Sequence, residues 1–380
     1  MLRFVLQRLF HAVAVLFTVV AVSFAVMRAA PGSPFDTEQP LPPAVVANQA
    51  RVLGMAEPVV ASAEGRLASV SVGPGQSVGA GQIYALLDGG VPLRAPEDLT
   101  VFRVVAAPGA TVGDGAPVLF KRTGFVEELF TTVGSWARLD FGVTVRSQGT
   151  RTVAQNLAEG LPVSAELGLY GLVVALLLAL PLGVAAGARP GSVWDRAVSA
   201  GLLFGISVPS LVLAPVLVAV FIMGLEWFPP HGGWEPGLFH GMSKKALPVL
   251  ALALPYAAVF GRLVRDGLAA QVNEDWFRHL AAKGLPLRVA LIRHALRPAL
   301  VPLVTYLGPA LASLLTGSFV VERVFQIPGI SRHFVDSALE RDYPMVLGVV
   351  MVYSAVLVVA NLAADLLHAW LDPRVRAESA

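Results

Sequence analysis

Residues 167–188 read LGLYGLVVALLLALPLGVAAGA and contain no Asp, Glu, Lys or Arg. About 20 apolar residues of α-helix cross a bilayer core of about 30 Å, so this stretch is long enough to span a membrane. A buried core helix is the alternative explanation for any one such stretch. Five more runs free of charged residues occur along the chain: 9–27, 197–225, 246–261, 298–321 and 343–364.

Six such runs predict an all-α polytopic membrane protein with six transmembrane helices. Run 246–261 is short, but its helix can continue through Arg262 because a long basic side chain reaches the interface. The first run follows Arg3 and Arg8 as a signal peptide would, yet it is long and lacks a good cleavage site after Met27. We therefore expect run 9–27 to be retained as a span, with cleavage as the alternative.

The composition supports a membrane protein and excludes several kinds of site. Of 380 residues, 55% are hydrophobic and 14% are charged, whereas soluble domains carry about a quarter charged residues. The absence of cysteine excludes disulfides, thiolate metal sites and cysteine nucleophiles. A net charge of +2 gives no reason to expect nucleic acid as a partner.

The charged loops predict the orientation. Segment 262–297 carries seven Lys or Arg against three Asp or Glu, which places it in the cytoplasm by the positive-inside rule. The long segment 36–160 carries nine basic and twelve acidic residues and is expected outside. With six spans both termini are cytoplasmic, in agreement with their basic residues, which are Arg3, Arg8, Arg374 and Arg376.

The basic loop has a local pattern of its own. Residues 271–302 read QVNEDWFRHLAAKGLPLRVALIRHALRPALVP. Asn273 or Asp275 is expected to cap a short helix, and Gly284 is expected to end it. Pro286 then begins a basic helix that enters the next span. An ordinary interfacial helix is the alternative interpretation of this pattern.

The same loop resembles the conserved cytoplasmic loop of ABC importer permeases of the dipeptide/oligopeptide/nickel family. The family pattern is roughly E-D-Y-hydrophobic-R-T-A-R-A-K-G-L followed by H-A-L-R-N-A and a proline. Residues 274–285 (EDWFRHLAAKGL) and 294–302 (HALRPALVP) are similar to it. The departures are Trp276, His279, Leu280, Ala281 and Pro298. Other similar stretches are 161–167 (LPVSAEL), 207–210 (SVPS), 328–330 (PGI) and 341–344 (RDYP).

The resemblance implies a type I importer permease of the first-permease type, in the bacterial cytoplasmic (inner) membrane. Such a chain forms half of a translocation pathway with a second permease. It works with one or two ATPase subunits, which bind ATP, and with an external substrate-binding protein. The family imports peptides, nickel chelates and other small solutes. No enzymatic activity is expected of this chain, which lacks the G-x-x-x-x-G-K-[ST] phosphate loop.

The resemblance also implies which residues contact the ATPase. The short cytoplasmic helix of such permeases enters a cleft of the ATPase subunit and couples its closure to the pathway. The matching positions here are Glu274, Asp275, Ala282, Lys283 and Gly284.

A few polar residues at or within the spans are further candidates. Glu166, Asn361 and Asp365 are candidates for the pathway or for helix contacts, because polar and ionisable groups in a membrane are often functional. Capping or pairing at the interface is the alternative for Glu166. No metal or cofactor is expected, since the seven histidines are scattered: His11, His231, His240, His279, His294, His333 and His368.

Residues 59–121 depart from the permease pattern. Residues 61–86 and 95–120 align without a gap at an offset of 34, with Pro74-Gly75 matching Pro108-Gly109. Alternating apolar residues predict short strands, and the Pro-Gly pairs predict turns between them. Two such halves predict a small all-β sandwich or flattened barrel.

This insertion resembles the biotinyl/lipoyl-like domain (barrel-sandwich) of carboxylase carriers and of membrane-fusion adaptors. Carriers present a modifiable lysine in the hairpin between the halves. Here that turn, residues 87–92, has no lysine, and the nearest is Lys121, so no modified lysine is expected. The insertion is expected to contact the substrate-binding protein or another envelope component, with an inert decoration as the alternative.

The expected organisation has four parts. They are 1–58 (first helix and start of the external loop), 59–121 (β insertion), 122–162 (rest of that loop) and 163–380 (five-helix core with coupling loop 262–297). An envelope adaptor and a stand-alone secondary transporter are the alternatives to an importer permease. Co-purification with an ATPase subunit separates them. The transported solute does not follow from these patterns.

Overall fold

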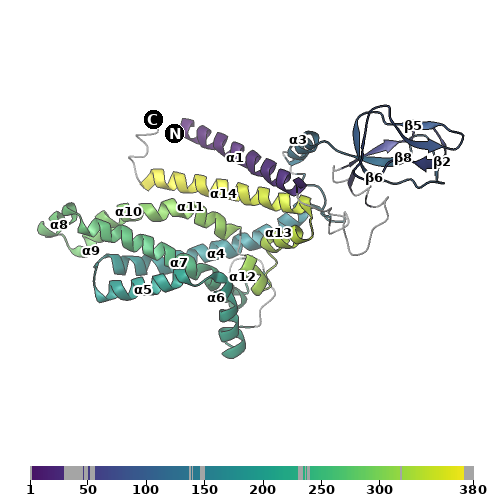
Figure 1. Cartoon of the computed structure of the whole chain (residues 1–380). Helices are drawn as coiled ribbons and strands as arrows, with labels where there is room; N and C mark the ends of the chain where they lie inside the picture. The colour runs from purple at the N-terminus through teal and green to yellow at the C-terminus, as the bar shows by residue number, and fades with distance from the viewer. Residues whose placement is uncertain are drawn as a thin grey trace. The chain divides into compact units, whose positions relative to one another are not determined.

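Figure 1 shows the computed structural model of the chain, which describes residues 2–29, 46, 50–51, 56–136, 138, 140–145, 150–229, 234–235, 237, 240–316 and 319–371. The chain is divided into two compact units. A helical unit comprises Met1–Val20, Leu157–Asp336 and Val349–Ala380, and a second unit comprises Ala21–Asn156 and Ser337–Gly348. The external segment expected before the insertion falls mostly outside the described residues, as do Arg374 and Arg376.

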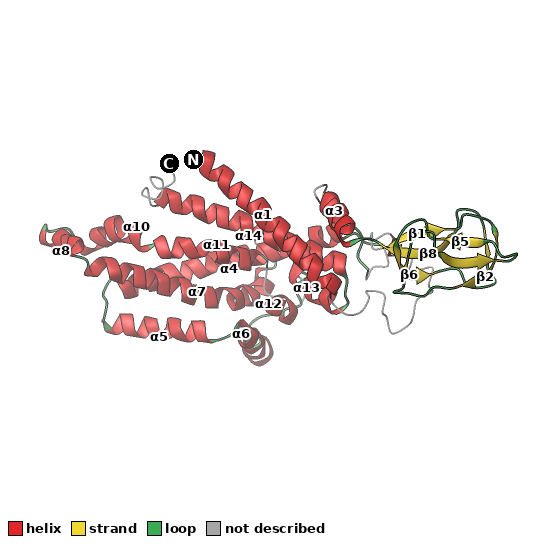
Figure 2. Cartoon of the chain, turned by 45° about the horizontal axis from the view of Figure 1, so that its top comes forward, coloured by secondary structure: helices red, strands yellow, loops and turns green. Residues whose placement is uncertain are grey.

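Helices make up most of the described chain, and the described strands lie between Ala56 and Arg122 (Figure 2). In chain order the helices are α1 (Leu2–Ala29), α3 (Phe125–Trp136), α4 (Val153–Gly187), α5 (Val193–Ser207), α6 (Ser210–Leu217), the π-helical η1 (Val218–Gly224), α7 (Met242–Asn273), α8 (Asp275–Ala282), α9 (Leu287–Val289), the π-helical η2 (Ala290–Ala295), α10 (Leu296–Ala299), α11 (Val301–Leu315), α12 (Phe319–Val324), α13 (Ile330–Leu339) and α14 (Tyr343–Leu371).

The apolar helices account for most of the six predicted spans. Among the described residues, four helical stretches are long and apolar enough to cross a membrane: Val153–Gly187, Met242–Asn273, Val301–Val324 and Tyr343–Leu367. A fifth span results if α5 is taken together with α6 and η1. In α1 the described apolar part, Val13–Val26, is shorter than a span. The structure therefore supports a polytopic helical protein with four or five such spans, and the count of six is not confirmed.

Run 197–225, expected as one span, is bent by 97° between α5 and α6. The bend lies at Val208 and Pro209. Val208 is extended, with φ −89° and ψ 112°, as expected of a residue that precedes proline. Pro209 lacks the N–H that would continue the helix, so α6 starts afresh at Ser210.

The long helices pack through small side chains. At Gly183 of α4, a Cβ atom would lie 2.6 Å from the carbonyl oxygen of Gly261 in α7. The two backbones therefore approach more closely than any larger residue allows, as in many membrane bundles. Between α4, α7 and α11 lies one buried cluster, made of Ala175, Ala179, Ala253, Ala257, Phe260, Val264, Leu303 and Ala310.

The predicted all-β insertion is present as two four-stranded sheets. The strands are β1 (Ala56–Val60), β2 (Gly65–Val70), β3 (Ser77–Val78), β4 (Ile83–Leu87), β5 (Pro92–Arg94), β6 (Leu99–Val104), β7 (Thr111–Val112) and β8 (Pro117–Arg122). The sheet orders are β1-β8-β6-β3 and β5-β4-β2-β7, and all pairs are antiparallel. Residues from both sheets, including Leu67, Tyr84, Val101 and Leu119, form one buried core.

The sequence repeat explains this topology. Adding 34 to the residue numbers of β2, β3 and β4 gives the positions of β6, β7 and β8. Exchanging equivalent strands turns the order of one sheet into the order of the other. The hydrogen bonds repeat too: the N–H of Gly75 donates to Val101 O, and the N–H of Gly109 donates to Leu67 O, both at 2.7 Å. Each sheet takes strands from both halves, so neither half can bury its apolar residues alone.

The repeated Pro-Gly turns require glycine at their second position. Gly75 and Gly109 have φ of 82° and 89°, in the left-handed region that side chains disfavour. Gly113, in contrast, is a turn glycine without positive φ, and nothing lies within 4 Å of a Cβ placed on it. A Cβ on Gly109 would meet only Arg66 Nη2, at an ordinary contact distance of 3.7 Å, so the two positions differ chiefly in backbone conformation.

Gly109→Ala is expected to destabilise the sandwich by about 1–2 kcal/mol, because alanine must adopt a left-handed conformation there. Gly113→Ala is the matched control and should leave stability nearly unchanged. Hydrogen exchange of the full-length protein measures both, at the amides of β2 and β7. Equal exchange rates in the two variants would contradict this account of the turn.

Candidate functional site

The loop between α7 and α10 forms the short helix α8. Glu274 separates the two helices in an extended conformation, with φ −73° and ψ 148°. Its carbonyl oxygen accepts hydrogen bonds from the N–H groups of Phe277, at 3.1 Å, and Arg278, at 3.4 Å. Glu274 therefore takes the cap position that the sequence assigned to Asn273 or Asp275. Asp275 lies in the first turn instead, where a carboxylate favours the helix dipole.

One face of α8 is anchored in the helical unit. Phe277 is 5% exposed and belongs to a buried cluster with Leu268 of α7 and Leu291 of η2. Burying a phenylalanine side chain contributes about 1.5–3 kcal/mol, so this residue helps to hold the short helix against its neighbours. Leu280, one turn further on, is half-buried against the same cluster.

The residues implied as ATPase contacts lie on the solvent side of the loop. Glu274, Asp275, Ala282, Lys283 and Gly284 are all exposed. The nearest described ion pair joins Asp275 to Arg278 at 3.7 Å, with both side chains largely exposed. Such a pair contributes about 1 kcal/mol or less, so it leaves the acidic end of α8 accessible to a partner.

Gly284 ends α8 with a left-handed turn. Its φ is 79°, and no atom lies within 4 Å of a Cβ placed on it. The N–H of Leu285 donates to the carbonyl oxygen of Leu280 at 3.2 Å, which closes the turn. The predicted glycine stop is therefore present, followed by Pro286 and the segments α9, η2 and α10. Their basic side chains, Arg288, Arg293 and Arg297, are exposed.

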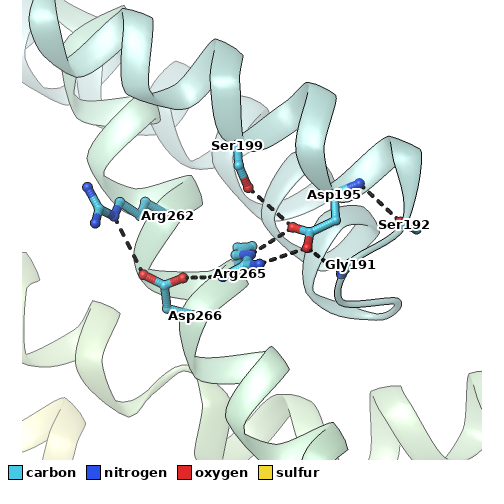
Figure 3. A network of polar contacts seen from close by, with 7 residues as sticks. All are labelled: Gly191, Ser192, Asp195, Ser199, Arg262, Arg265 and Asp266. Carbon is cyan, nitrogen blue, oxygen red and sulfur yellow. Dashed lines mark hydrogen bonds and ion pairs between the residues drawn. The ribbon is translucent and has the colours of Figure 1, made fainter.

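A second polar site joins α5 to α7 (Figure 3). Arg265 of α7 donates from Nε to Asp195 Oδ1 at 2.8 Å and from Nη2 to Asp195 Oδ2 at 2.7 Å. The carboxylate also accepts from the Gly191 N–H at 2.8 Å and from the Ser199 hydroxyl at 3.2 Å. Asp195 is 3% exposed in its side chain and is thus a buried anion with a full set of donors.

Glu166 takes part in a third polar site, between α4 and α7. Its Oε1 lies 2.7 Å from Nζ of Lys245, a side chain with no exposed surface. Lys245 also donates to the carbonyl oxygen of Gly237 at 2.9 Å. The indole N–H of Trp234 donates to Glu166 Oε2 at 3.1 Å, and the Lys245 ammonium lies 4.8 Å from the Trp234 ring centroid. Glu166 is therefore a pairing residue that ties the segment at 234–237 to the helices.

A buried carboxylate, Glu322, organises the segment around α12 and α13. It is 1% exposed. The hydroxyl of Ser164 donates to its Oε1 at 2.7 Å, and the N–H of Ser331 donates to its Oε2 at 3.1 Å. The same Ser164 hydroxyl accepts the N–H of Ile330 at 2.8 Å. A Cβ at Gly329 would collide with the Glu322 carboxylate, which explains glycine in the PGI stretch.

Asn361 and Asp365 lie in α14, and both are half-buried. A Cβ at Gly308 of α11 would come within 2.6 Å of Asn361 Oδ1, so the amide lies directly on the α11 backbone. The described contacts of Asn361 are thus helix contacts. The structure does not bring Asn361 or Glu166 together with the residues of α8 at one site.

Several buried charges were missed because they lie at the ends of the apolar runs. Asp195 and Lys245 come just before runs 197–225 and 246–261, and Glu322 directly follows 298–321. In the structure these residues lie within helices, where they are buried. A charged residue at the edge of an apolar run was therefore the available sign of a buried charge. The residue that pairs with it could not be identified, because it lies far away in the sequence. Among the described residues, no group of three or more His, Asp or Glu side chains is arranged to hold a metal ion.

Comparisons with known proteins identify the family. Residues 179–377 match the family described as "Binding-protein-dependent transport system inner membrane component". The oligopeptide transport system permease protein OppB of Salmonella typhimurium is 32% identical over 99% of this chain and 100% of its own length. The dipeptide transport system permease protein DppB of Bacillus subtilis is 35% identical over 68% of this chain and 80% of its own.

A solved structure of the MetNI methionine ABC transporter, in inward-facing conformations, also matches. It covers 57% of this chain and 97% of its own at 17% identity, with a TM-score of 0.45.

The chain belongs to the family of binding-protein-dependent transport system inner membrane components. It is a multi-pass inner-membrane permease subunit of an ATP-driven ABC importer, and its relatives are permeases and not enzymes. The sequence-based prediction of an importer permease is thereby confirmed. An envelope adaptor and a stand-alone secondary transporter, the two alternatives, lack comparable support.

The Lys245 site makes a testable prediction about stability. Lys245→Met leaves the Glu166 carboxylate unpaired, and we expect a loss of about 3 kcal/mol in the free energy of unfolding. Lys244→Met is the matched control, since Lys244 pairs with Glu235 at 3.0 Å on the surface. Its loss should be about 1 kcal/mol or less. Thermal unfolding of the detergent-solubilised protein measures both.

The double variant Glu166→Gln with Lys245→Met removes both charges. It should recover part of the stability lost in Lys245→Met, because no unpaired carboxylate remains. Equal melting temperatures for Lys244→Met and Lys245→Met would contradict the role given to this pair.

Proposed function

We propose that this chain forms half of a transmembrane pathway for peptides or similar small solutes. The observation that carries the proposal is the match to an oligopeptide permease over 99% of this chain and 100% of the relative. In this proposal the chain pairs with a second permease, and one or two ATPase subunits bind and hydrolyse ATP. An external substrate-binding protein delivers the solute.

The loop geometry supports coupling through α8. Its buried face, centred on Phe277, fixes the helix to α7 and η2, while Glu274, Asp275 and Lys283 remain exposed. A helix held on one side and accessible on the other can transmit a push from a partner cleft to the bundle. Glu274, Asp275, Ala282, Lys283 and Gly284 are the proposed contacts with the ATPase.

The proposed membrane arrangement has six spans with both termini in the cytoplasm. Helix α1 contains 28 residues, which at about 1.5 Å per residue is long enough to cross a bilayer. The bent pair α5 and α6–η1 then forms one broken span. The basic residues of loop 262–297 support a cytoplasmic position for α8.

The proposed domain organisation keeps the four parts 1–58, 59–121, 122–162 and 163–380, with the β insertion outside. We propose that the insertion is a lipoyl-like contact module for the substrate-binding protein. Lys121 supports a role without a modified lysine, because it lies in strand β8 and pairs with Glu57 at 2.8 Å and with Glu97. The hydrogen bonds that the Lys121 ammonium donates to these two carboxylates raise the pKa of Lys121.

Gly284→Asp tests the coupling role. Aspartate tolerates a left-handed conformation better than most residues, and no atom crowds the position, so the loop should still fold. We expect the uptake of a radiolabelled oligopeptide to fall at least about tenfold while ATP hydrolysis continues, because a coupling contact is lost. The measurement uses the complete transporter in liposomes. The control is His279→Ala, a substitution at an exposed residue of α8.

Normal uptake by a well-expressed Gly284→Asp transporter would contradict the coupling assignment. Absence of oligopeptide uptake by the wild-type transporter, together with uptake of nickel chelates, would contradict the substrate class.

The deletion of the β insertion tests its role. Residues 56–122 are the suitable unit, because Ala56 and Arg122 are directly paired at the two ends of the sandwich. Joining the flanks with a short Gly/Ser bridge should leave assembly and basal ATP hydrolysis unchanged. We expect the affinity of the transporter for its binding protein to fall, measured as the half-saturating concentration of that protein in uptake. Unchanged affinity would show that the insertion is a decoration.

A further inference from the structure

Helices α5 and α7 run antiparallel and lie side by side (Figure 1). Their contact follows a regular register. At Gly205 a Cβ would lie 2.9 Å from the Cβ of Ala258, and at Gly261 a Cβ would lie 2.9 Å from Cδ2 of Leu202. One end of this contact is closed by the Arg265–Asp195 pair. The contact is therefore closely packed and apolar along most of its length and polar at one end.

These two kinds of contact respond differently to force. The apolar part of the contact, which includes Leu202 against Gly261, holds the helices together through packing that has no fixed direction. The Arg265–Asp195 contact is bidentate, at 2.7 and 2.8 Å, and its direction is fixed by the planar guanidinium. Sliding α7 past α5 would break both bonds and leave a buried carboxylate without its cation.

The surroundings of the pair hold each partner in place. Asp195 is held within its own turn by the Gly191 N–H and the Ser199 hydroxyl, and the hydroxyl of Ser192 caps its N–H at 3.1 Å. Arg265 also donates to Asp266 at 2.8 Å, which fixes the guanidinium on α7. Figure 3 shows these contacts, which hold the pair at both ends.

The pair is also close to the anchored face of α8. Arg265 lies one turn before Leu268, which is fully buried and packs against Phe277 of α8. At Gly187 of α4, a Cβ would lie 2.7 Å from the carbonyl oxygen of Arg265 and 2.9 Å from the Cβ of Leu268. The end of α7 that carries Arg265 is thus packed against α8 and cannot move independently of it without breaking this cluster.

We propose that the Asp195–Arg265 pair is the rigid link through which a displacement of α8 moves α5 together with α7. The inference rests on the proposed coupling role of α8 and assigns the next step of that path. Beyond the bend at Pro209, α5 continues into α6 and η1, whose residues Ala214, Leu217 and Val218 pack in the core with Leu247 of α7. Asp195 and Arg265 are positioning residues, and neither contacts a substrate in this role.

Variants in the complete transporter test the link. Arg265→Gln and Asp195→Asn are expected to reduce oligopeptide uptake per ATP hydrolysed by roughly tenfold, with ATP hydrolysis within about twofold of wild type. The double variant should resemble either single variant, since all three remove one interaction. Arg262→Gln is the matched control, because Arg262 pairs with Asp266 at 3.6 Å on the exposed side of the same helix.

A distance measurement tests the link without any transported solute. The chain has no cysteine, so spin labels can be attached at cysteines replacing the exposed Trp194 of α5 and His279 of α8. With Arg265 intact, the distance between the labels should be the same with and without ATP. With Arg265→Gln, ATP should shift or broaden it. If Arg265 had only a structural role, Arg265→Gln would lower expression, but the distance between the labels would not depend on ATP.

The outcomes separate this inference from the proposed function. If Gly284→Asp uncouples the transporter but Arg265→Gln and Asp195→Asn do not, and the label distance is insensitive to Arg265→Gln, the link is overturned. If Gly284→Asp has no effect on uptake per ATP hydrolysed, the proposed coupling role of α8 is contradicted, whatever the result for the Asp195–Arg265 pair. Parallel losses of uptake and ATP hydrolysis in Arg265→Gln would also overturn the link, since they indicate a loss of folding alone.

Discussion

Burying charge inside an apolar helix bundle is possible only where each charge has its partners in place, and this constraint shapes the helical unit. Glu166 with Lys245, Asp195 with Arg265, and Glu322 with two serines each satisfy it. Each site connects separate helices through bonds whose loss would leave a buried charge without its partner. Small residues bring the backbones close, and these polar sites fix the register at which they meet.

The β insertion reaches a stable structure by a different route. It has no long helix, and its core forms only when strands from both repeats alternate in the two sheets. The turns at Gly75 and Gly109 repeat the same left-handed backbone at equivalent places. The chain therefore combines one unit whose polar groups must be paired internally with another that forms a conventional core beneath a polar surface.

Helix α8 has one face fixed to the bundle and another that is exposed. Phe277 supplies the fixed face, Gly284 the turn, and exposed charged residues the face available to a partner. In the proposed function the partner of α8 is an ATPase subunit, and the proposed Asp195–Arg265 link carries a displacement of α8 to α5. The helix, its anchor and the ion pair thus lie along one continuous path of packed residues.

Much of this architecture could be predicted from the sequence, because it depends on local properties. Apolar runs, the glycine stop at Gly284 and the 34-residue repeat indicated most of the helices, the end of α8 and the two-sheet insertion. The break at Pro209 was present as a proline inside an apolar run, but hydropathy does not reveal bending. The tertiary structure alone decided which charges meet: Lys245 lies 79 residues from Glu166, and Arg265 lies 70 residues from Asp195. A lone charge beside an apolar run indicates that a partner is needed, but which one it finds depends on how distant helices pack.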